Sequence, residues 1–455
     1  MLEERIQIYK NFDLKIKEDS YVLYWMQQSH RVNYNHALEH AIHVANKESL
    51  PLVVYFGLTK KFPDANERHY AFMLEGLKEV AVELKKMGIL FFLIEKSPEK
   101  GIVDLLDKAS AVILDKGYLN IQKKWRKEVI ESLMDSNIGY VAEVDTDLIV
   151  PVNIASTKCE YAARTIRPKI NKLFDYFSLK FKLPELEKKW ATESPIEISD
   201  SVDIEEMDIS DYLKNLEIDH SVKKSPIYRG GYSEALRLFD DFLENKLSHY
   251  KLNSPILDAS SRMGMYLHFG QISSLELYHR MNDYLLENTT IDKESVEAFR
   301  EQLVIRRELA FNYVYYNEDY DCFEGMTDSW AYETMDKHQN DIRPYLYSLD
   351  DLMAAKTHDK NWNKVMDEMV TTGYMNNYMR MYWGKKIIEW TPNFKIAYQY
   401  MSLLNNKYFL DGRDANSFAG VAWCFGKHDH GWGERDVFGK LRYMNAEGLK
   451  RKFKI

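Results

Sequence analysis

The stretch NNYMRMYWGKKIIEW, residues 376–390, has helical character and holds two tryptophans close to cationic side chains. Trp383 and Trp390 are seven residues apart, close to two helical turns, so they share one face about 10 Å apart along the axis. Two indoles in line either fill a core or carry something along the helix. Arg380 stands among methionines just before them, and a cation in so apolar a context needs a carboxylate partner or an anionic ligand.

A second segment, DASSRMGMYLHFGQISS (258–274), contains the residue types of a phosphate site. Ser260 and Ser261 stand ahead of an apolar helical stretch. Hydroxyls together with the free N–H groups of a helix N-terminus suit a phosphate or a pyrophosphate. Two adjacent serines are also a common helix cap, so the segment alone leaves both interpretations open.

A third segment, LDGRDANSFAGVAWCFG (410–426), combines glycines with carboxylate and amide groups. Asp411, Asp414 and Asn416 could bond to a ribose or to the edge of a heterocycle, and Trp423 could stack on a planar ligand. The alternative is an ordinary Asx-rich turn with a packed indole. Asp411 is also a candidate partner for the Arg380 cation.

The first third of the chain alternates short apolar runs with amphipathic ones. The apolar runs have the length and β-rich composition of strands and lie at 21–26, 50–58, 89–95, 111–116 and 140–145. Helical patterns fill the four intervals, and this alternation predicts a parallel, doubly wound, Rossmann-like α/β sheet. No GxGxxG follows the first strand, where YWMQQSHR stands, which argues against a dinucleotide-dependent dehydrogenase.

The remainder of the chain is predicted to be helical. The segment 183–225 is acidic and poorly periodic, which is typical of a connector between domains. After it, long helical patterns with many aromatic residues occupy 233–250, 274–288, 294–316 and 363–390. We therefore expect an α/β domain at 1–182, an acidic linker at 183–225 and an all-α domain at 226–455 that is aromatic enough to line a large pocket.

Bulk composition limits the function classes. Cys159, Cys322 and Cys424 are isolated and odd in number, which argues against a disulfide framework or a zinc module and for a reducing compartment. No apolar run approaches a membrane span, and the N-terminus lacks an apolar signal core, so a cytoplasmic protein is expected. The net charge of −9 argues against nucleic acid, yet the basic, aromatic tail 427–455 permits a local nucleic-acid surface or simply a solvated helical tail.

Seven motifs occur in a fixed order along the chain. They are CEYAARTIRPKI (159–170), YLHFGQIS (266–273), RRELAFNY (306–313), KTHDKNWN (356–363), YMRMYWGKKIIEW (378–390), NNKYFLDGRD (405–414) and WGERDVFGKLRYM (432–444). Together with the N-terminal YVLYWMQQSHRVNYNHAL, they resemble the class II cyclobutane pyrimidine dimer (CPD) photolyases of the photolyase/cryptochrome superfamily. The resemblance spans essentially the whole chain, and the architecture of that family agrees with the domains expected above.

The resemblance implies a folded FAD in the helical domain. In that family, fully reduced FAD excited by blue or near-UV light gives an electron to a thymine dimer flipped out of DNA, and the electron returns once the dimer has split. The residues implied to hold FAD are Tyr250, Ser260 and Ser261 at the phosphates, Gly264 offering only its N–H where relatives often have Ser, Arg380 and Asp411 as a salt bridge beside the isoalloxazine, Asn405 near flavin N5, and Asp414 and Asn416 on the polar rim.

The resemblance also gives the aligned tryptophans a role. Trp383 resembles the flavin-proximal member of the family's electron chain, Trp362 the middle member and Trp390 the surface member. Indoles suit this role because their large π-systems can be oxidised transiently, and a surface indole lets an external reductant refill the chain. Core packing remains the alternative for each tryptophan taken singly.

On the substrate side, the family pattern places Trp423 against the flipped dimer and Met381 on its flavin side. Gln302 stands where the family has an active-site Glu, and Glu301 lies one residue earlier, about 100° round the helix. An amide can still donate a hydrogen bond to the dimer, so we expect repair at reduced efficiency. Further expected DNA contacts are Arg306, His430, Lys440, Arg442 and Lys450.

The favoured hypothesis is a light-driven repair lyase that acts on UV-damaged DNA as a monomer, with no metal site and no membrane association. The alternative is a cryptochrome-like blue-light photoreceptor with the same FAD and tryptophan chemistry but weak or no repair. Gln302 is the feature that favours this alternative. A second, antenna chromophore could lie against the α/β domain, although no residue set in the sequence identifies it.

Overall fold

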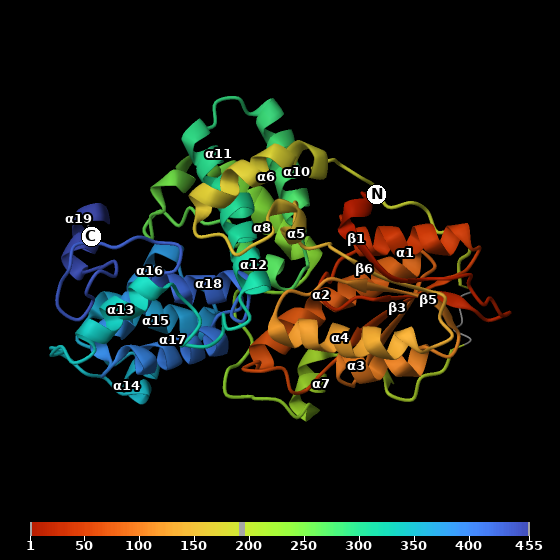
Figure 1. The fold of residues 1–455 in the computed structure, drawn as a ribbon, viewed down its shortest axis with the longest axis horizontal. Helices are drawn as coiled ribbons and strands as arrows, with labels where there is room; N and C mark the ends of the chain where they lie inside the picture. The colour runs from red at the N-terminus through yellow and green to blue at the C-terminus, as the bar shows by residue number, and fades with distance from the viewer. Residues whose placement is uncertain (1, 191–195, 454–455) are drawn as a thin grey trace.

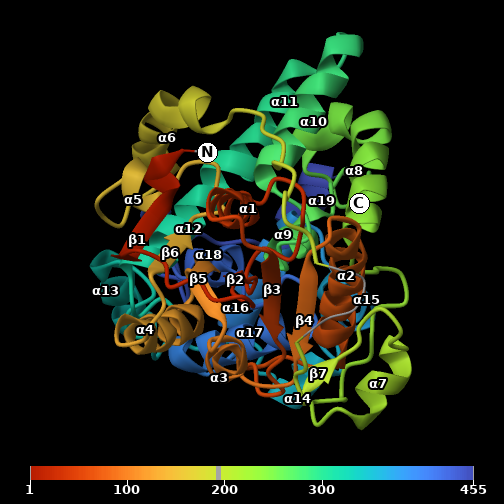
Figure 2. The ribbon, with the colours of Figure 1, turned by 90° about the vertical axis from the view of Figure 1, so that its right-hand side faces the viewer.

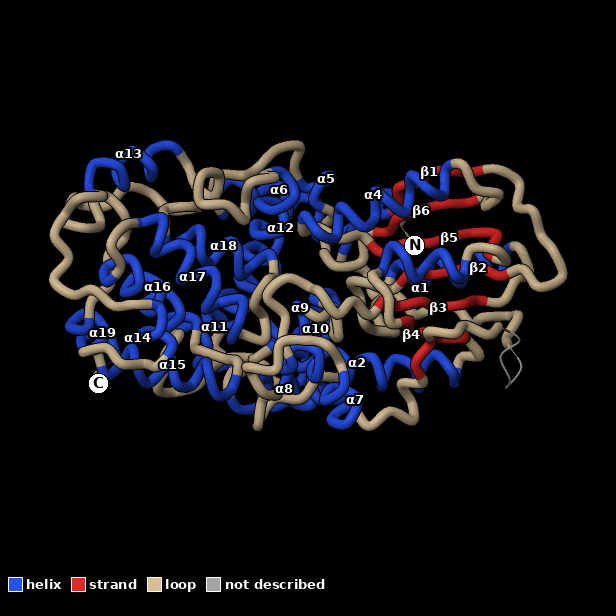
Figure 3. The backbone as a smooth tube through the Cα atoms, turned by 90° about the horizontal axis from the view of Figure 1, so that it is seen from below, coloured by secondary structure: helices blue, strands red, loops and turns tan. Residues whose placement is uncertain are grey.

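The computed structural model describes residues 2–190 and 196–453. A sheet with its covering helices forms one end of the molecule, and the other end is helical (Figure 1 and Figure 3). In the described ranges the sheet has seven strands in the order β1-β6-β5-β2-β3-β4-β7. The strands are β1 (Ile6–Asn11), β2 (Tyr21–Trp25), β3 (Leu52–Gly57), β4 (Leu90–Ile94), β5 (Ala109–Asp115), β6 (Tyr140–Val144) and β7 (Ser201–Val202).

The five predicted strands are present as β2 to β6, and neighbouring members of this set pair in parallel. The prediction of a wholly parallel sheet is wrong at both edges, because β1 pairs antiparallel with β6 and β7 pairs antiparallel with β4. The sequence of β1, IQIYKN, is half polar and partly exposed, as suits an edge strand. It therefore contains no apolar run that would have revealed it.

Both faces of the sheet are covered, so central strands such as β2 and β3 are apolar on both sides (Figure 2). Val22 and Tyr24 lie in one core with helix α1 (His36–Lys47), and α2 (Glu67–Lys86) adds residues to the same core. Leu23, between them in β2, belongs to the core on the opposite face. That second core includes residues of α4 (Asn120–Met134) and of η2 (Ile102–Leu105), which continues α3 (Pro98–Gly101).

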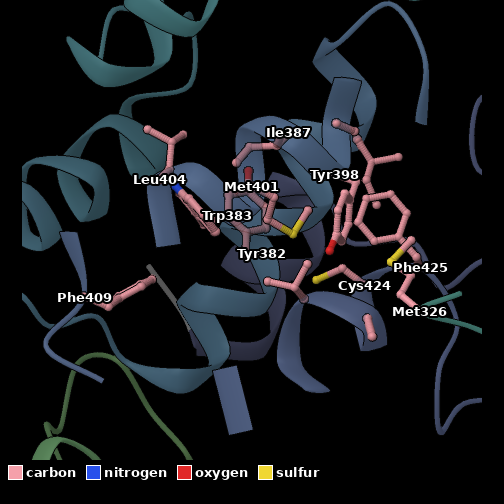
Figure 4. Close-up of a cluster of buried hydrophobic side chains, with 14 of the residues drawn as sticks. Met326, Tyr382, Trp383, Ile387, Tyr398, Met401, Leu404, Phe409, Cys424 and Phe425 are labelled. Carbon is pink, nitrogen blue, oxygen red and sulfur yellow. The ribbon is translucent and has the colours of Figure 1, made fainter. Parts of the chain in front are cut away.

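The helical part assembles around two buried clusters rich in aromatic and methionine side chains, and Figure 4 shows a section of one of them. A short helix, η1 (Glu3–Arg5), precedes β1 at the start of the chain. The elements of the helical part and of the connector are α5 (Val152–Ala155), α6 (Ala163–Phe177), α7 (Ile209–Asn215), α8 (Tyr232–Asn245), η3 (Leu247–Leu252), α9 (Met263–His268), α10 (Ser274–Glu287), α11 (Lys293–Arg300), η4 (Glu301–Arg306), α12 (Arg307–Tyr316), α13 (Ser329–His338), α14 (Leu349–Met353), α15 (Lys360–Thr372), α16 (Asn377–Trp390), α17 (Phe394–Tyr408), α18 (Ala415–Cys424) and α19 (Ala446–Phe453).

Two expectations about these elements are corrected by the structure. The pattern at 363–390 is two helices, because Gly373 ends α15 in the left-handed region at φ +84° and Asn376 caps α16. Residues 163–177, which fall within the range expected for the α/β domain, form helix α6, whose apolar face packs in a core with α8 and α10. The expected connector contains β7 and the short helix α7, and its residues 191–195 lie outside the described residues.

A buried arginine joins the two parts of the molecule. Arg68 of α2 is 3% exposed and donates to the carbonyl oxygens of Met369 at 3.1 Å and Tyr408 at 2.8 Å. These carbonyls belong to the last turns of α15 and α17. The Met369 carbonyl also accepts from the Gly373 N–H at 2.9 Å, and the Tyr408 carbonyl, in the last residue of α17, has no acceptor role within its helix. The cation therefore ends two helices of the helical part and fixes them against the sheet domain.

Candidate active site

A cavity of about 530 Å³ opens in the helical part, within the size range of sites for small molecules and cofactors. Segments far apart in sequence form its wall, namely η3, the loop before α9, η4, α16, α17 and α18. The sequence-predicted residues that line it are Tyr250, Ser260, Ser261, Gly264, Gln302, Arg306, Arg380, Met381, Trp383, Asn405, Asp411, Asp414, Asn416, Trp423 and Arg442. Trp362, Trp390, His430 and Lys440 do not line it.

An ion pair joins Arg380 of α16 to Asp411 in the loop after α17. The guanidinium Nη2 donates to Asp411 Oδ1 at 2.9 Å, and the guanidinium carbon lies 3.8 Å from the centre of the Phe409 ring. A Cβ atom at Gly264 would lie 2.9 Å from Asp411 Oδ2, which is closer than side chains pack. Glycine at 264 therefore leaves room for this carboxylate, and a serine there would have to displace it.

Polar side chains at the start of α18 form a second part of the wall. Asp414 caps this helix by accepting from the Asn416 backbone N–H at 2.8 Å, and the Asn416 amide Nδ2 donates to the same carboxylate oxygen at 2.9 Å. Burial alone would raise the pKa of Asp414, but hydrogen bonds from His268 and Asn416 and the Arg307 cation outweigh it and lower that pKa. Asn405 of α17, 3% exposed, donates to Ser417 Oγ at 2.7 Å.

Arg262, which the sequence analysis missed, stands next to the two serines of the wall. It has a left-handed backbone at φ +63°, lies 3.6 Å above the Tyr374 ring and pairs with Asp258. Its buried Nη1 has no hydrogen-bond partner among the described residues. A buried, unsatisfied guanidinium N–H beside two hydroxyls fits an anionic ligand such as a pyrophosphate. The only sequence signal was the run Ser-Ser-Arg.

The three tryptophans form a continuous series that begins at the cavity. Trp383 lines the wall, and the Trp362 indole Nε1 donates to the Trp383 carbonyl oxygen at 3.1 Å. The rings of Trp362 and Trp390 follow, with centres 5.6 Å apart and planes at 67°. These contacts place all three indoles within a single buried path.

The prediction that Trp390 lies at the surface is wrong, because its side chain is 1% exposed. The rings of Tyr347 and His358 cover it, with centres 5.5 Å and 5.2 Å from the indole. His358 in turn stacks on Tyr345 at 3.8 Å, and Tyr345 is 48% exposed. The covering residues come from the loop before α14 and the loop before α15, which no local pattern around Trp390 could indicate.

The rim of the cavity holds the residues expected on the substrate side. Gln302 is exposed on η4, a π-helical turn of the kind that often marks functional sites. Glu301 points elsewhere, because its carboxylate pairs with Arg167 at 2.7 Å and with Arg306 at 3.1 Å. Gln302, and not its acidic neighbour, therefore reaches the cavity.

Aromatic and basic side chains continue beyond the rim along the C-terminal loop. The Arg442 guanidinium lies 5.3 Å from the Trp423 ring and 4.8 Å from the Trp432 ring. His430 stacks on Trp432 at 4.8 Å, outside the cavity, and Lys440 is exposed on the same loop. The expected helical tail is helical only in α19, because residues 427–445 form an ordered loop.

A second, smaller cavity of about 90 Å³ lies between the sheet domain and the helical part. Gln27 and Gly57 place it at the carboxyl ends of β2 and β3, where open α/β sheets bind ligands. His30 lines it, and its buried Nδ1 has no hydrogen-bond partner within the described ranges. Burial lowers the pKa of His30 to about 4, so the ring is neutral at physiological pH. His268, which also lines this cavity, pairs with Asp414 in the wall of the larger one at 3.3 Å.

Among the residues the structure describes, no group of three or more His, Cys, Asp and Glu side chains is placed to hold a metal ion. None of the described helices is both long and apolar enough to cross a membrane.

The chain matches proteins that are named for one activity. The family model described as DNA photolyase matches residues 22–187. A deoxyribodipyrimidine photo-lyase of Methanothermobacter thermautotrophicus is 43% identical over 439 residues, which are 96% of this chain and 93% of that protein. The enzyme of the same name from Potorous tridactylus is 37% identical over 442 residues, covering 95% of this chain and 79% of the relative.

Solved structures share the fold at lower identity. A cryptochrome of Synechocystis superposes with a TM-score of 0.75 at 14% identity, covering 96% of this chain and 86% of its own. A photolyase of Sulfolobus tokodaii, described with two FAD molecules, superposes with a TM-score of 0.70 at 17% identity, covering 95% and 87%. The sheet domain, the helical part and the near-complete match to the curated photo-lyases agree, and the chain belongs to the DNA photolyase family of the photolyase/cryptochrome superfamily.

Proposed function

We propose that this protein is a class II CPD photolyase, which splits cyclobutane pyrimidine dimers in DNA with the energy of blue or near-UV light. The observation that carries the proposal is the convergence of the motif residues on one cavity, in a chain that matches curated photo-lyases over almost its whole length. The assignment to class II rests on the seven ordered motifs and on the spacing of Trp362, Trp383 and Trp390. The three cysteines are free, which suits a reducing, cytoplasmic compartment.

The larger cavity fits FAD. Ser260, Ser261 and the unsatisfied N–H of Arg262 offer donors to a pyrophosphate, while Arg380 paired with Asp411 offers a cation that a flavin ring could share. The reduced cofactor, when excited by light, supplies the electron that opens the dimer and receives it back afterwards. Asn405, held by Ser417, is the amide we assign to the flavin N5 region.

Arg262→Met is expected to weaken FAD binding by about 1.5–3 kcal/mol, the range for hydrogen bonds to charged groups, which is roughly a 10- to 150-fold rise in Kd. The measurement is titration of the flavin-free protein with FAD. Arg237→Met is the control, since Arg237 lies on α8, pairs with Glu234 and does not line the cavity. Equal FAD affinity of R262M and wild type would remove Arg262 from the phosphate site.

The substrate is a pyrimidine dimer flipped out of DNA into the same cavity. Flipping a damaged pair costs less than flipping a sound one, because the dimer is already poorly paired and stacked. Trp423 offers a stacking surface and Met381 an apolar contact beside the flavin region. The cations Arg306, Arg442 and Lys440 would hold phosphates of the duplex, and His430 with Trp432 would fill space near the vacated position.

Gln302→Leu is expected to lower repair about two- to tenfold, since one hydrogen bond is worth about 0.5–1.5 kcal/mol. Gln302→Glu should raise repair above wild type, because a protonated carboxyl donates more strongly to the negative charge that the dimer receives. Dimer repair per absorbed photon measures both effects. Glu297→Gln serves as the control, because Glu297 lies on α11, pairs with Arg300 and does not line the cavity. Equal repair by all four proteins would take Gln302 out of the reaction.

The smaller cavity is the place we assign to an antenna chromophore. It combines aromatic walls, amide groups and the free ring nitrogen of His30, and at about 90 Å³ it has room for one edge of a planar heteroaromatic molecule with a hydrogen-bond donor rather than for the whole molecule. Extraction of the purified protein followed by mass spectrometry identifies the chromophore.

The experiment that tests the proposed function is repair of an oligonucleotide with one thymine dimer by the reduced protein, in blue light and in darkness. Restoration of the two thymines in light alone is the expected result. A protein whose flavin photoreduces normally while the dimer persists would instead be a photoreceptor of the cryptochrome kind. That outcome would overturn the repair function and retain the cofactor assignment.

A further inference from the structure

Lys385 is a buried lysine on α16, two residues beyond Trp383 and outside the lining of the cavity. Its side chain is 0% exposed, and its Nζ donates to the carbonyl oxygen of Cys424 at 2.6 Å. The same ammonium lies 5.3 Å from the centre of the Trp423 ring. No carboxylate of the described residues forms an ion pair with it, in contrast to Lys386, which pairs with Glu389.

The end of α18 explains why an ammonium is tolerated there. A buried charge without a carboxylate partner is costly, and burial lowers the pKa of Lys385 to about 8. Cys424 is the last residue of α18, where carbonyl groups lack intrahelical partners and the helix dipole favours a cation. Lys385 thus caps from α16 the helix that carries Trp423.

The two helices approach each other closely at this point. A Cβ atom at Gly384 would lie 2.8 Å from Cys424 Sγ and 3.2 Å from Met401 Sδ, so glycine is required at the crossing. Trp383, Met401 and Cys424 lie in the cluster of Figure 4. On the rim side, Arg442 lies 5.3 Å from the Trp423 ring, so the indole contacts one buried and one exposed cation. The buried one is fixed by a backbone hydrogen bond and the exposed one is not.

We propose that Lys385 is a positioning residue for the substrate, whose ammonium ties the end of α18 to α16 and holds the Trp423 indole in the orientation that stacks on the flipped dimer. This inference rests on the proposed role of Trp423 as the stacking surface. Because Lys385 does not line the cavity, it acts through Trp423 and not by touching the dimer.

The contact predicts a pH dependence of dimer binding. The charged or titratable groups around Lys385 are Cys424, Asp429 and Arg442. Burial raises the pKa of the Cys424 thiol to about 11, and a guanidinium keeps its proton, so neither changes between pH 7 and pH 9.5. Loss of the Lys385 proton weakens the cap above about pH 8. The pKa of Lys385 in the folded protein is below its usual value of 10.5, so the unfolded chain binds this proton more tightly and the free energy of unfolding rises with pH. Weaker dimer binding at high pH is therefore not caused by unfolding through this group.

The test measures dark binding of an oligonucleotide with one thymine dimer to the flavin-loaded protein. Lys385→Met is expected to raise the Kd about tenfold, and Lys385→Arg, which keeps the cation, should stay near wild type. Lys386→Met is the matched control, because this neighbouring lysine is 6% exposed and lies 5.8 Å from Trp390 rather than near Trp423. Normal photoreduction of the flavin through Trp383 shows that each variant is folded.

A double-mutant cycle separates positioning from general damage. In a Trp423→Ala background, Lys385→Met should add nothing, because the group it positions is absent. Wild-type dimer affinity should fall between pH 7 and pH 9.5, whereas that of K385R should not, and this comparison stands even if K385M fails to fold. Equal Kd values for K385M and wild type, an undiminished effect in the W423A background, or identical pH profiles would overturn the proposal. Equal dimer affinity of W423A and wild type would instead overturn the role of Trp423, and this inference with it.

Discussion

Trp383→Phe is expected to abolish photoreduction of the flavin while leaving repair by chemically reduced protein intact. Trp383 is the member of the buried tryptophan series that lines the cavity, and Trp362 contacts its backbone. Phenylalanine fills most of the indole volume but is much harder to oxidise, so the path to Trp390 is cut at its first step. The measurement is the loss of oxidised flavin absorbance under blue light with an external thiol.

The control for this variant is Trp190→Phe. The Trp190 indole donates to the Leu52 carbonyl oxygen at 2.8 Å, and the core of the sheet domain against which it packs contains no residue that lines the helical cavity. It should photoreduce like wild type. Photoreduction of W383F at the wild-type rate would contradict the electron path and would return the three tryptophans to core packing.

Trp423→Ala is expected to weaken binding of a dimer-containing oligonucleotide by about 1–3 kcal/mol, the cost of losing one base-stacking aromatic, which is roughly 5- to 150-fold in Kd. Trp423 is half-buried in the cavity wall and packs at the edge of the core, and the Arg380–Asp411 pair of the flavin region does not contain it. Trp423→Phe should recover part of the affinity, since a smaller ring still stacks.

The same preparation supplies the controls for Trp423. Flavin content and photoreduction of W423A should match wild type, because the Arg380–Asp411 pair and the tryptophan series do not depend on this ring. Unchanged dimer affinity together with intact flavin chemistry would mean that the dimer binds elsewhere. Loss of flavin from W423A would mean that the ring supports the cofactor rather than the substrate.

The central strands of the sheet could be predicted because their burial on both faces is visible in the composition of each strand alone. Strands such as Leu52–Gly57 are buried on both faces and therefore read as unbroken apolar runs. The edge strand Ile6–Asn11 forms because it pairs with β6, and its half-polar sequence contains no apolar run from which a strand could be predicted. The break between α15 and α16 was visible in principle, since Gly373 and Asn376 are a typical helix end and helix start.

The candidate site was predicted mainly through the ordered motifs, and what escaped prediction depends on distant contacts. The burial of Trp390 comes from Tyr347 and His358, which belong to other elements. The unsatisfied nitrogen of Arg262 results from a left-handed backbone that its sequence does not demand. The sequence does not distinguish Lys385 from the adjacent Lys386, and only the approach of α18 shows that the Lys385 ammonium is buried against Cys424.

The most direct measurement is a crystal structure of the protein with reduced FAD and a duplex that carries one thymine dimer. Both are expected to occupy the larger cavity, with the flavin beside the Arg380–Asp411 pair and the flipped dimer stacked on Trp423. A dimer that stays stacked within the duplex, or a flavin bound outside this cavity, would contradict this arrangement.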